Sequence, residues 1–151
     1  MRDLVTACDE TRSGYRVTIN ETITFHLSPA DYRALPLHAG DPVDWETYRH
    51  DLLLRQYPDA LQRAVAMLAT RAHSRREVER KLADKGYIAE AIEMVVFKLE
   101  KEGLLDDEAF AHARASAGIH RGLGKARIQQ ELRMKGVAEP LVQDADRKSV
   151  V

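Results

Sequence analysis

Three groups of side chains in this 151-residue sequence are of types that can carry chemistry: histidines, a glycine–lysine pair and adjacent aspartates. The six histidines are scattered, without the i, i+4 pair and carboxylate that a helical zinc site needs. Gly122–Lys125 invites comparison with a phosphate-binding loop, yet Ile119 and Ala126 stand where such a loop needs Gly and Ser or Thr. Asp106 and Asp107 suit a helix start better than acid–base catalysis. We therefore expect neither an enzyme nor a bound metal or cofactor.

Positive charge on helices is the remaining candidate for function. Residues 71–85 hold six cations against three acids, and residues 114–135 hold six against one. A charge-rich run is usually a solvated helix face, but repetition aligns these cations along one surface that suits phosphate or an acidic protein. Aromatic side chains are missing among them, so base-specific binding of single strands is not expected. The cations are Arg71, Arg75, Arg76, Arg80, Lys81 and Lys85, then Arg114, Arg121, Lys125, Arg127, Arg133 and Lys135.

The bulk composition excludes several classes of protein. The net charge is -1 and 31% of the residues are charged, so the chain is neither a polycation nor an acidic disordered tail. Its single cysteine, Cys8, cannot form an internal disulfide, which favours a reducing compartment. No stretch approaches the roughly 20 apolar residues that span a bilayer. We expect a cytoplasmic protein without a membrane segment.

The elements that position these side chains begin with a predicted β-hairpin. Apolar residues alternate between Tyr15 and Leu27, which indicates strands. A three-residue loop at 20–22 makes Ile19 face Ile23, so that all apolar residues share one face. The pairs expected on this face are Ile19 with Ile23, Val17 with Phe25, and Tyr15 with Leu27.

Further elements flank this hairpin on both sides. Residues 3–7 are a candidate third strand. Ser28 and Pro29 predict a short helix, and Asp44 is the expected N-cap of another that begins at Trp45. From there to the C-terminus the pattern is helical, and the helix that starts at Asp106 or Asp107 is expected to weaken at Gly118.

An internal repeat relates two helical stretches at a constant offset in residue number, so that Gly86 aligns with Gly136. Both glycines can take the left-handed conformation that closes a helix, and Lys85 and Lys135 place a cation at that end. A fixed offset across apolar, glycine and cationic positions predicts tandem three-helix modules. The aligned pairs are Arg71 with Arg121, Val78 with Ile128, Leu82 with Leu132, Lys85 with Lys135, Gly86 with Gly136, Tyr87 with Val137, and Ile92 with Val142.

The predicted fold class is therefore mainly α, with two three-helix repeats after a small N-terminal sheet and a helix. We expect the hairpin and its helices in residues 1–57, the first module in 58–106 and the second in 107–151. The third helix of the second module, which starts near Pro140, is expected to be short and to fray from Asp146.

Three stretches stand out for their order and spacing: HSRREVERKLADKGY at 73–87, GLLDDEAFAHA at 103–113 and HRGLGKARIQQELRMKGV at 120–137. They resemble the RecX family, and with the hairpin and the Trp45 helix the resemblance covers roughly residues 12–145. The resemblance implies an inhibitory protein that usually has three modules. Because two modules are found here, we expect weaker inhibition than in a three-module member.

The resemblance implies a regulator of the recombinase RecA. Such a protein binds RecA filaments on single-stranded DNA, lies in their helical groove, and opposes filament growth, strand exchange, ATP hydrolysis and the coprotease activity of the SOS response. For this chain we expect no cofactor, a monomer, and at most weak, sequence-independent contact with DNA. The cations expected to contact RecA or DNA are Arg75, Arg76, Arg80, Lys81, Arg121, Lys125, Arg127 and Arg133.

The alternative from another class is a DNA-binding helical module, such as a helix-turn-helix-like transcription regulator. Short helices with a basic second member can imitate that motif. It requires sequence-specific duplex binding and usually a dimer seam. The sequence offers no long apolar heptad, and its basic helix carries only Gln129 and Gln130 as amide side chains.

Overall fold

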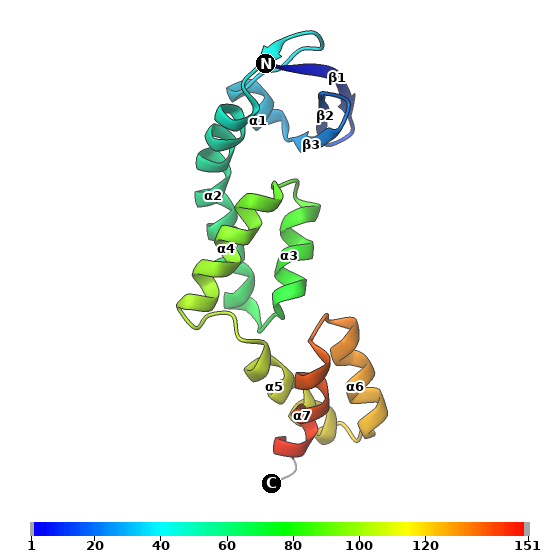
Figure 1. Ribbon diagram of the computed structural model, residues 1–151. Coiled ribbons are helices and arrows are strands. Elements are labelled where there is room, and N and C mark those ends of the chain that lie inside the picture. Colours follow the sequence, from blue (N-terminus) through cyan, green and yellow to red (C-terminus); the bar gives the residue numbers. More distant parts are fainter. Residues whose placement is uncertain (1, 150–151) are drawn as a thin grey trace. The chain divides into compact units, whose positions relative to one another are not determined.

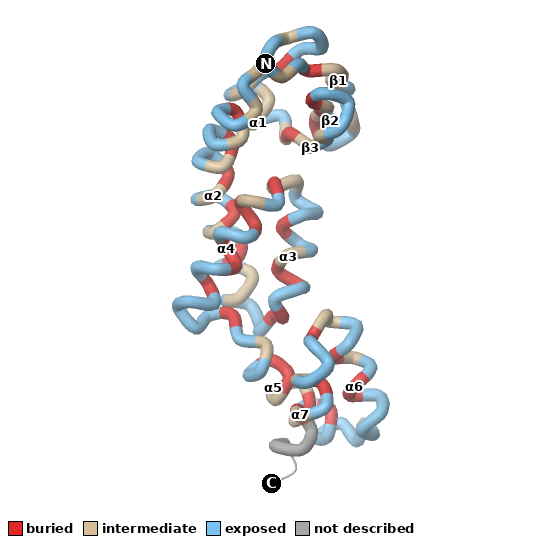
Figure 2. Tube along the Cα trace, viewed as in Figure 1, coloured by how far each residue is buried: buried red, intermediate tan, exposed pale blue. Residues whose placement is uncertain are grey.

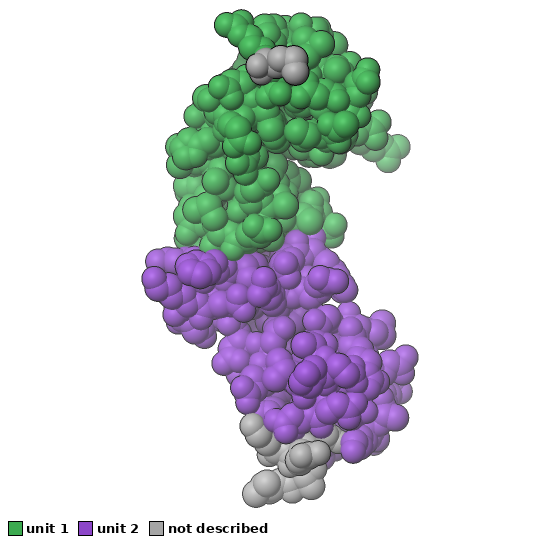
Figure 3. Space-filling view, viewed as in Figure 1, with its two compact units in different colours: residues 1–62, 82–95 green, residues 63–81, 96–151 purple. Residues whose placement is uncertain are grey.

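The computed structural model describes residues 2–149, which form four β-strands and seven α-helices (Figure 1). The chain divides into two compact units, coloured separately in Figure 3. Unit 1 comprises the chain up to Gln62 together with Leu82–Val95, and unit 2 comprises Arg63–Lys81 together with the chain from Val96 onward. The predicted fold class is confirmed. None of the helices within residues 2–149 is long and apolar enough to cross a membrane.

The strands form one antiparallel sheet with the order β3-β2-β1-β4. The predicted hairpin register is confirmed, because Ile19 pairs with Ile23 across a three-residue loop. In that loop Asn20 and Glu21 have φ angles of 53° and 60°. The first strand extends beyond its predicted end at residue 7, and β4 was missed because two residues show no alternation. The strands are β1 Asp3–Thr11, β2 Gly14–Ile19, β3 Ile23–Leu27 and β4 Pro42–Val43.

The short helix α1, Pro29–Ala34, begins as predicted. The Ser28 hydroxyl accepts a hydrogen bond from the Asp31 amide at 3.1 Å. The Asp31 carboxylate accepts from the buried Gln56 side chain at 3.0 Å, and Gln56 in turn accepts from the Ile88 amide at 2.9 Å. Both ends of the buried Gln56 amide are therefore satisfied, as burial of a polar group requires.

The core of unit 1 lies on one face of the sheet and is red in Figure 2. Aromatic rings close its edges: Tyr15 stacks on Tyr32 with ring centroids 3.8 Å apart, and Phe25 contacts Trp45 at 4.9 Å. These pairs combine large apolar area with favourable ring geometry. The buried residues are Val5, Val17, Ile19, Leu27, Leu37, Tyr48, Leu52, Ile88 and Ala91.

Helix α2, Trp45–Thr70, runs for 26 residues through Pro58 without a break. The domain boundary predicted after residue 57 thus falls inside a helix. Pro58 and Leu54, whose carbonyl loses its amide partner, are both exposed, so water can satisfy that carbonyl. The second predicted boundary, after residue 106, lies next to the start of α5, and the division into modules stays a prediction.

The constant offset of the repeat holds for the helices themselves. It separates the starts of α3 and α6, the starts of α4 and α7, and the ends of α2 and α5. Gly86 and Gly136 close α3 and α6 with φ angles of +92° and +80°, as predicted. Val137 donates to the Leu132 carbonyl at 3.1 Å, as Tyr87 donates to the Leu82 carbonyl at 3.3 Å. The helices are α3 Arg75–Asp84, α4 Ala89–Lys101, α5 Asp107–His120, α6 Lys125–Met134 and α7 Glu139–Ser149.

Two expectations about the last helices were wrong. α5 does not weaken at Gly118 but continues to His120, and Gly118 is buried inside it. A Cβ at this position would lie 2.9 Å from Cγ1 of Ile128, so the glycine permits close approach of α6. α7 is not short, since its backbone stays helical from Glu139 to Ser149; the end of the expected frayed tail, residues 150–151, lies outside the described residues.

The core of the second module is formed by α5, α6 and α7 within unit 2. Its side chains follow the helical spacing seen in the sequence, which is why the apolar stripes predicted the helices correctly. The buried residues are Phe110, Ala111, Ala115, Ile128, Leu132, Val137, Val142 and Ala145.

Candidate partner-binding surface

Helix α3 begins with a reciprocal pair of hydrogen bonds between Ser74 and Glu77. The Glu77 amide donates to the Ser74 hydroxyl at 3.1 Å, and the Ser74 amide donates to Glu77 Oε1 at 3.2 Å. This is a capping box, which satisfies two otherwise unpaired amides at a helix start. Both side chains are buried. The Ser-x-x-Glu spacing is the sequence signal for this cap, and it was missed.

Glu77 also holds two cations from different parts of the chain. Its Oε2 accepts from Arg71 Nη2 at 2.8 Å and from Lys135 Nζ at 3.1 Å, while only 8% of its side chain is exposed. Burial raises the pKa of Glu77, but the hydrogen bonds from Arg71, the Ser74 amide and Lys135 outweigh it and lower the pKa to about 2. Arg71 and Lys135 therefore belong to a structural ion cluster, whereas the sequence analysis counted them among the cations aligned along one surface.

Other contacts join the same face of α3 to the end of α6. The Ser74 hydroxyl donates to the Lys135 carbonyl at 2.5 Å, and Arg80 Nη1 donates to the Met134 carbonyl at 3.2 Å. The stem of Arg76 lies on Gly136 so closely that a Cβ there would come within 2.3 Å of Arg76 Cβ. We call this set, Ser74, Arg76, Glu77 and Arg80 against residues 134–136, the α3–α6 junction. It lies entirely within unit 2.

A buried histidine holds one of the predicted contact residues, Lys81. His73 Nδ1 donates to the Arg71 carbonyl at 3.0 Å, and its Nε2 accepts from Lys81 Nζ at 2.9 Å, since an ammonium can only donate. Burial lowers the pKa of His73, and the positive charges of Arg71 and Lys81 act in the same direction. The imidazole is therefore neutral at neutral pH.

Arg75 connects the start of α3 to the start of α5. Its backbone amide donates to Asp107 Oδ1 at 2.8 Å, and its Nη1 lies 3.2 Å from Glu100 Oε1. Asp106 caps α5, as predicted, by accepting from the Ala109 amide at 3.1 Å. Asp106 thus caps α5, whereas the adjacent Asp107 accepts a hydrogen bond from the first amide of α3.

The cations of the second module differ in how firmly they are held. Arg121 Nη2 and Arg127 Nε lie 3.6 Å and 3.7 Å from the Glu131 carboxylate, and both arginine side chains are well exposed. Arg133 forms a fork on Glu139, with Nη2 to Oε1 at 2.7 Å and Nε to Oε2 at 2.9 Å. The hydrogen bonds of Arg133 lower the pKa of Glu139 to about 2. Arg133 is therefore held more tightly within the protein than Arg121 or Arg127.

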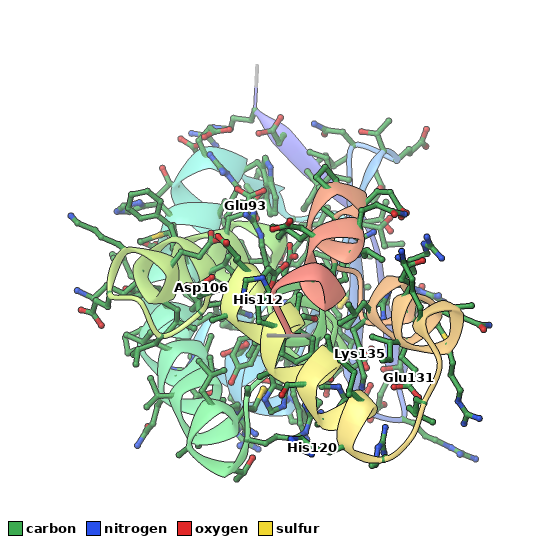
Figure 4. All side chains as sticks on the ribbon, turned by 90° about the horizontal axis from the view of Figure 1, so that it is seen from below. Glu93, Asp106, His112, His120, Glu131 and Lys135 are labelled. Atoms are coloured by element: carbon green, nitrogen blue, oxygen red, sulfur yellow. The ribbon has the colours of Figure 1, made fainter. Side chains whose placement is uncertain are left out.

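The eight predicted contact residues thus all lie in unit 2 but not in one equivalent setting. On α3, Arg76 and Arg80 form part of the α3–α6 junction. Lys81 donates to His73, and the Arg75 amide donates to Asp107 at the start of α5. On the second module, Arg121 and Arg127 converge on Glu131, which Figure 4 labels together with Lys135. Lys125, at the start of α6, is exposed but has a partner within the protein.

One group of metal-ligand side chains gathers among the described residues. Ligand atoms of Glu108, His112 and Asp144 all lie within 4.8 Å of one another, where α5 passes α7 (Figure 4 labels His112). This group was missed at the level of sequence because Asp144 is distant along the chain, although Glu108 and His112 have i, i+4 spacing. Each of the three already has a partner within the protein, and two are acids at or near the surface. The group therefore carries no metal assignment.

The repeated helices and their constant offset define a tandem helical-repeat protein built from three-helix modules. Two family models match these modules: the first three-helix domain of RecX at residues 60–99 and the second at residues 106–145. Together they cover just over half of the chain. The chain belongs to the RecX family.

Individual relatives agree with this assignment. The chain is 43% identical over 88 residues to the regulatory protein RecX of Pelodictyon phaeoclathratiforme, covering 58% of this chain and 55% of that protein. It is 41% identical over 81 residues to that of Halorhodospira halophila, covering 54% and 50%. The chain thus matches about half the length of these curated relatives.

Solved structures show the same fold at lower identity. A crystal structure of regulatory protein RecX covers 97% of this chain and 73% of its own, with a TM-score of 0.60 and 21% identity. RecX from Lactobacillus salivarius covers 64% and 60%, with a TM-score of 0.56 and 22% identity. The likeness to the first of these structures therefore includes the N-terminal sheet as well as the modules.

Proposed function

We propose that this protein is a regulator that binds RecA filaments on single-stranded DNA and inhibits their growth. Membership of the RecX family supports a regulatory role, because the relatives are named regulatory proteins. The observation that carries the proposal is the combination of two RecX three-helix domains with exposed arginines on their surface. Reduced strand exchange, ATP hydrolysis and coprotease activity follow from fewer or shorter filaments. A cytoplasmic location is part of the same proposal.

On the second module, the ion pairs of Arg121 and Arg127 with Glu131 can be replaced by pairs with a binding partner. The side chains of Arg121 and Arg127 are 63% and 70% exposed, and both share the single carboxylate of Glu131, at 3.6 Å and 3.7 Å. Exposed pairs of this length contribute little to stability, so a partner's carboxylate or phosphate can replace Glu131 at low cost. Arg133 is less available to a partner, because its two hydrogen bonds to Glu139 must break first.

The cations of α3 have a second role that affects how the proposal is tested. Arg76 packs on Gly136 and Arg80 donates to the Met134 carbonyl, so reversing either charge also disturbs the α3–α6 junction. Loss of inhibition by such variants does not separate contact from structure. Arg121→Glu and Arg127→Glu are therefore the cleaner substitutions, because they leave this junction in place.

The experiment is a titration of this protein into RecA on single-stranded DNA, with the RecA ATPase rate as readout at two salt concentrations. Inhibition well below one protein per RecA supports binding that blocks filament growth. Inhibition should weaken with salt, because the contacts are charged. An unchanged ATPase rate at a large excess of this protein would refute the proposal.

A duplex-binding control separates the helix-turn-helix-like alternative. The proposed regulator makes only weak DNA contact that is independent of sequence, so two unrelated duplexes should bind equally and poorly. Tight binding to one duplex sequence, with no effect on the RecA ATPase, would favour a transcription regulator instead.

A further inference from the structure

A buried histidine and an exposed lysine form a pair that lies outside the α3–α6 junction. His73 is only 3% exposed, whereas Lys81 is exposed on α3. The Lys81 ammonium group donates to His73 Nε2 at 2.9 Å, and His73 Nδ1 donates to the Arg71 carbonyl at 3.0 Å. All three residues lie within unit 2. The buried ring therefore determines where an exposed charge is held.

The second repeat shows that the fold does not require a histidine at this position. At the constant offset of the repeat, His73 corresponds to Leu123, which is partly buried and packs against the core of the second module. Lys81 corresponds to Glu131, so both members of the pair differ between the repeats. Leucine fills such a site without the cost of burying a polar ring. The imidazole of the first repeat thus acts through its nitrogen atoms rather than through packing.

Lys81 differs from Arg75 on the same helix in the kind of group that it contacts. Arg75 Nη1 lies 3.2 Å from the carboxylate of Glu100, whereas the acceptor for Lys81 is a neutral ring. Within the part of the chain that the structure describes, Lys81 forms no ion pair. A charged donor gains more from an ionised acceptor than from a neutral one. A partner's carboxylate or phosphate can therefore draw Lys81 away from His73.

Departure of the lysine changes the charges that act on the ring. Burial lowers the pKa of His73, the charges of Arg71 and Lys81 lower it further, and the backbone hydrogen bond and the charge of Glu77 oppose them. Glu77 is held by Arg71 and by Lys135 at the end of α6, so it stays in place when Lys81 leaves. Removal of the ammonium group therefore raises the proton affinity of His73 and leaves Nε2 open to a proton.

We propose that His73 is a positioning residue that holds Lys81 in the free protein and takes up a proton when an acidic group of the partner engages Lys81. The proton comes from solvent and binds Nε2, the nitrogen that the lysine has left. Because binding then takes up a proton, affinity should rise as the pH falls. This inference rests on the proposed function, in which the partner is the RecA filament. It adds a coupling between binding and protonation.

The first measurement needs no partner. The Cε1–H signal of His73, assigned by its absence in His73→Gln, is followed by NMR while the pH is lowered, in the unmodified protein and in Lys81→Gln. The titration midpoint of His73 should move to higher pH in Lys81→Gln, because a neighbouring positive charge is gone. Lys81 is exposed, so this substitution leaves the core intact. An unchanged midpoint would overturn the inference.

The second measurement is the affinity of the whole protein for RecA filaments assembled on labelled single-stranded DNA, at pH 7.5 and at pH 5.5. The gain in affinity at the lower pH should be about threefold larger for the unmodified protein than for His73→Gln. Lys81→Gln should lose the same part of the pH dependence. The matched control is His50→Gln, which removes an exposed imidazole on α2 and should keep the pH dependence of the unmodified protein. Circular dichroism at both pH values verifies that each variant is folded.

The outcomes separate this inference from the proposed function. If the unmodified protein binds filaments at neither pH, the proposed function fails and the inference fails with it, whatever the NMR result. If it binds and His73→Gln keeps the full pH dependence, only the inference is refuted. An equal loss of affinity at both pH values in His73→Gln would indicate a purely structural role and would also refute it. Loss of the pH dependence in His50→Gln would show that protonation acts through overall charge, which likewise overturns the inference.

Discussion

The ammonium group of Lys135 lies 3.1 Å from the carboxylate of Glu77, although the two residues are 58 positions apart in the sequence. Glu77 is at the first turn of α3 and Lys135 directly follows α6, so this contact joins the two repeats of the chain. The carboxylate is nearly buried, whereas the ammonium group keeps some access to solvent. Stability should therefore depend more on the acid than on the base.

Replacing the buried acid should destabilise the protein. Glu77→Gln keeps an acceptor for the Ser74 amide but leaves Arg71 and Lys135 without their counterion, and we expect the free energy of unfolding to fall by about 2 kcal/mol. Glu79→Gln is the control, because Glu79 is more exposed and its contact with Arg75 is 3.6 Å long. Urea unfolding followed by circular dichroism measures both. Equal, small losses in the two variants would show that the ion cluster is not stabilising.

The same cluster predicts a dependence of stability on acid pH. The pKa of Glu77 is lowered to about 2 in the folded protein, below its ordinary value of 4.5, so its contribution is present above pH 4.5 and is lost as the pH falls toward 2. Unmodified protein and Glu77→Gln should therefore converge in stability across this window. Unfolding free energies measured at intervals from pH 6 to pH 2.5 test this, and parallel curves would contradict it.

His73 predicts a second transition at higher pH. Its pKa is lowered from 6.5 in the folded protein, so the unfolded chain binds the proton more readily and stability falls as the pH drops below 6.5. His73→Gln keeps a donor for the Arg71 carbonyl and an acceptor for Lys81 but cannot titrate. The stability of this variant should change less between pH 7.5 and 5.5 than that of the unmodified protein. A matching slope in both proteins would exclude His73 as the titrating group.

Comparing Gly136 with Gly103 distinguishes the cost of a strained backbone from the cost of a steric contact. Gly136 and Gly103 have φ angles of +80° and +75°, but only at Gly136 would a Cβ strike another residue, Arg76. Gly103→Ala should cost about 1 kcal/mol from the left-handed backbone alone, and Gly136→Ala should cost clearly more. Adding Arg76→Gly to Gly136→Ala removes the Arg76 Cβ that the new methyl group would strike, and Arg76→Gly alone measures the cost of that glycine in α3. Equal melting temperatures of the two single variants would disprove close packing at the junction.

Local order was predictable because it depends on neighbours in the sequence. The hairpin register follows from period-two alternation and loop length, and the cap at Ser28 from residues within one helical turn. The helix ends at Gly86 and Gly136 were predictable for the same reason, since only glycine takes that backbone easily. The limit expected after residue 57 was an exception, since it falls inside α2, which continues through Pro58 because the interrupted carbonyl is exposed.

The candidate surface was predictable only in part. The sequence identified the charged stretches but gave every cation the same weight. The structure shows that Arg133 is held by a fork on Glu139, Lys81 by His73, and that Arg127 remains well exposed. These differences depend on which acid lies nearby after folding, and spacing along a helix cannot supply that.

By itself, the sequence determined the order of the elements, most of their ends, the internal repeat and the kinds of charge that each repeat carries. Only the tertiary structure decided which charges face one another. Glu77 and its repeat-equivalent Arg127 occupy the same helical position, yet one is buried against Lys135 and the other borders an open groove. The reason is that periodicity records which face of a helix is apolar, whereas ion pairs depend on distances between segments that are remote in the chain.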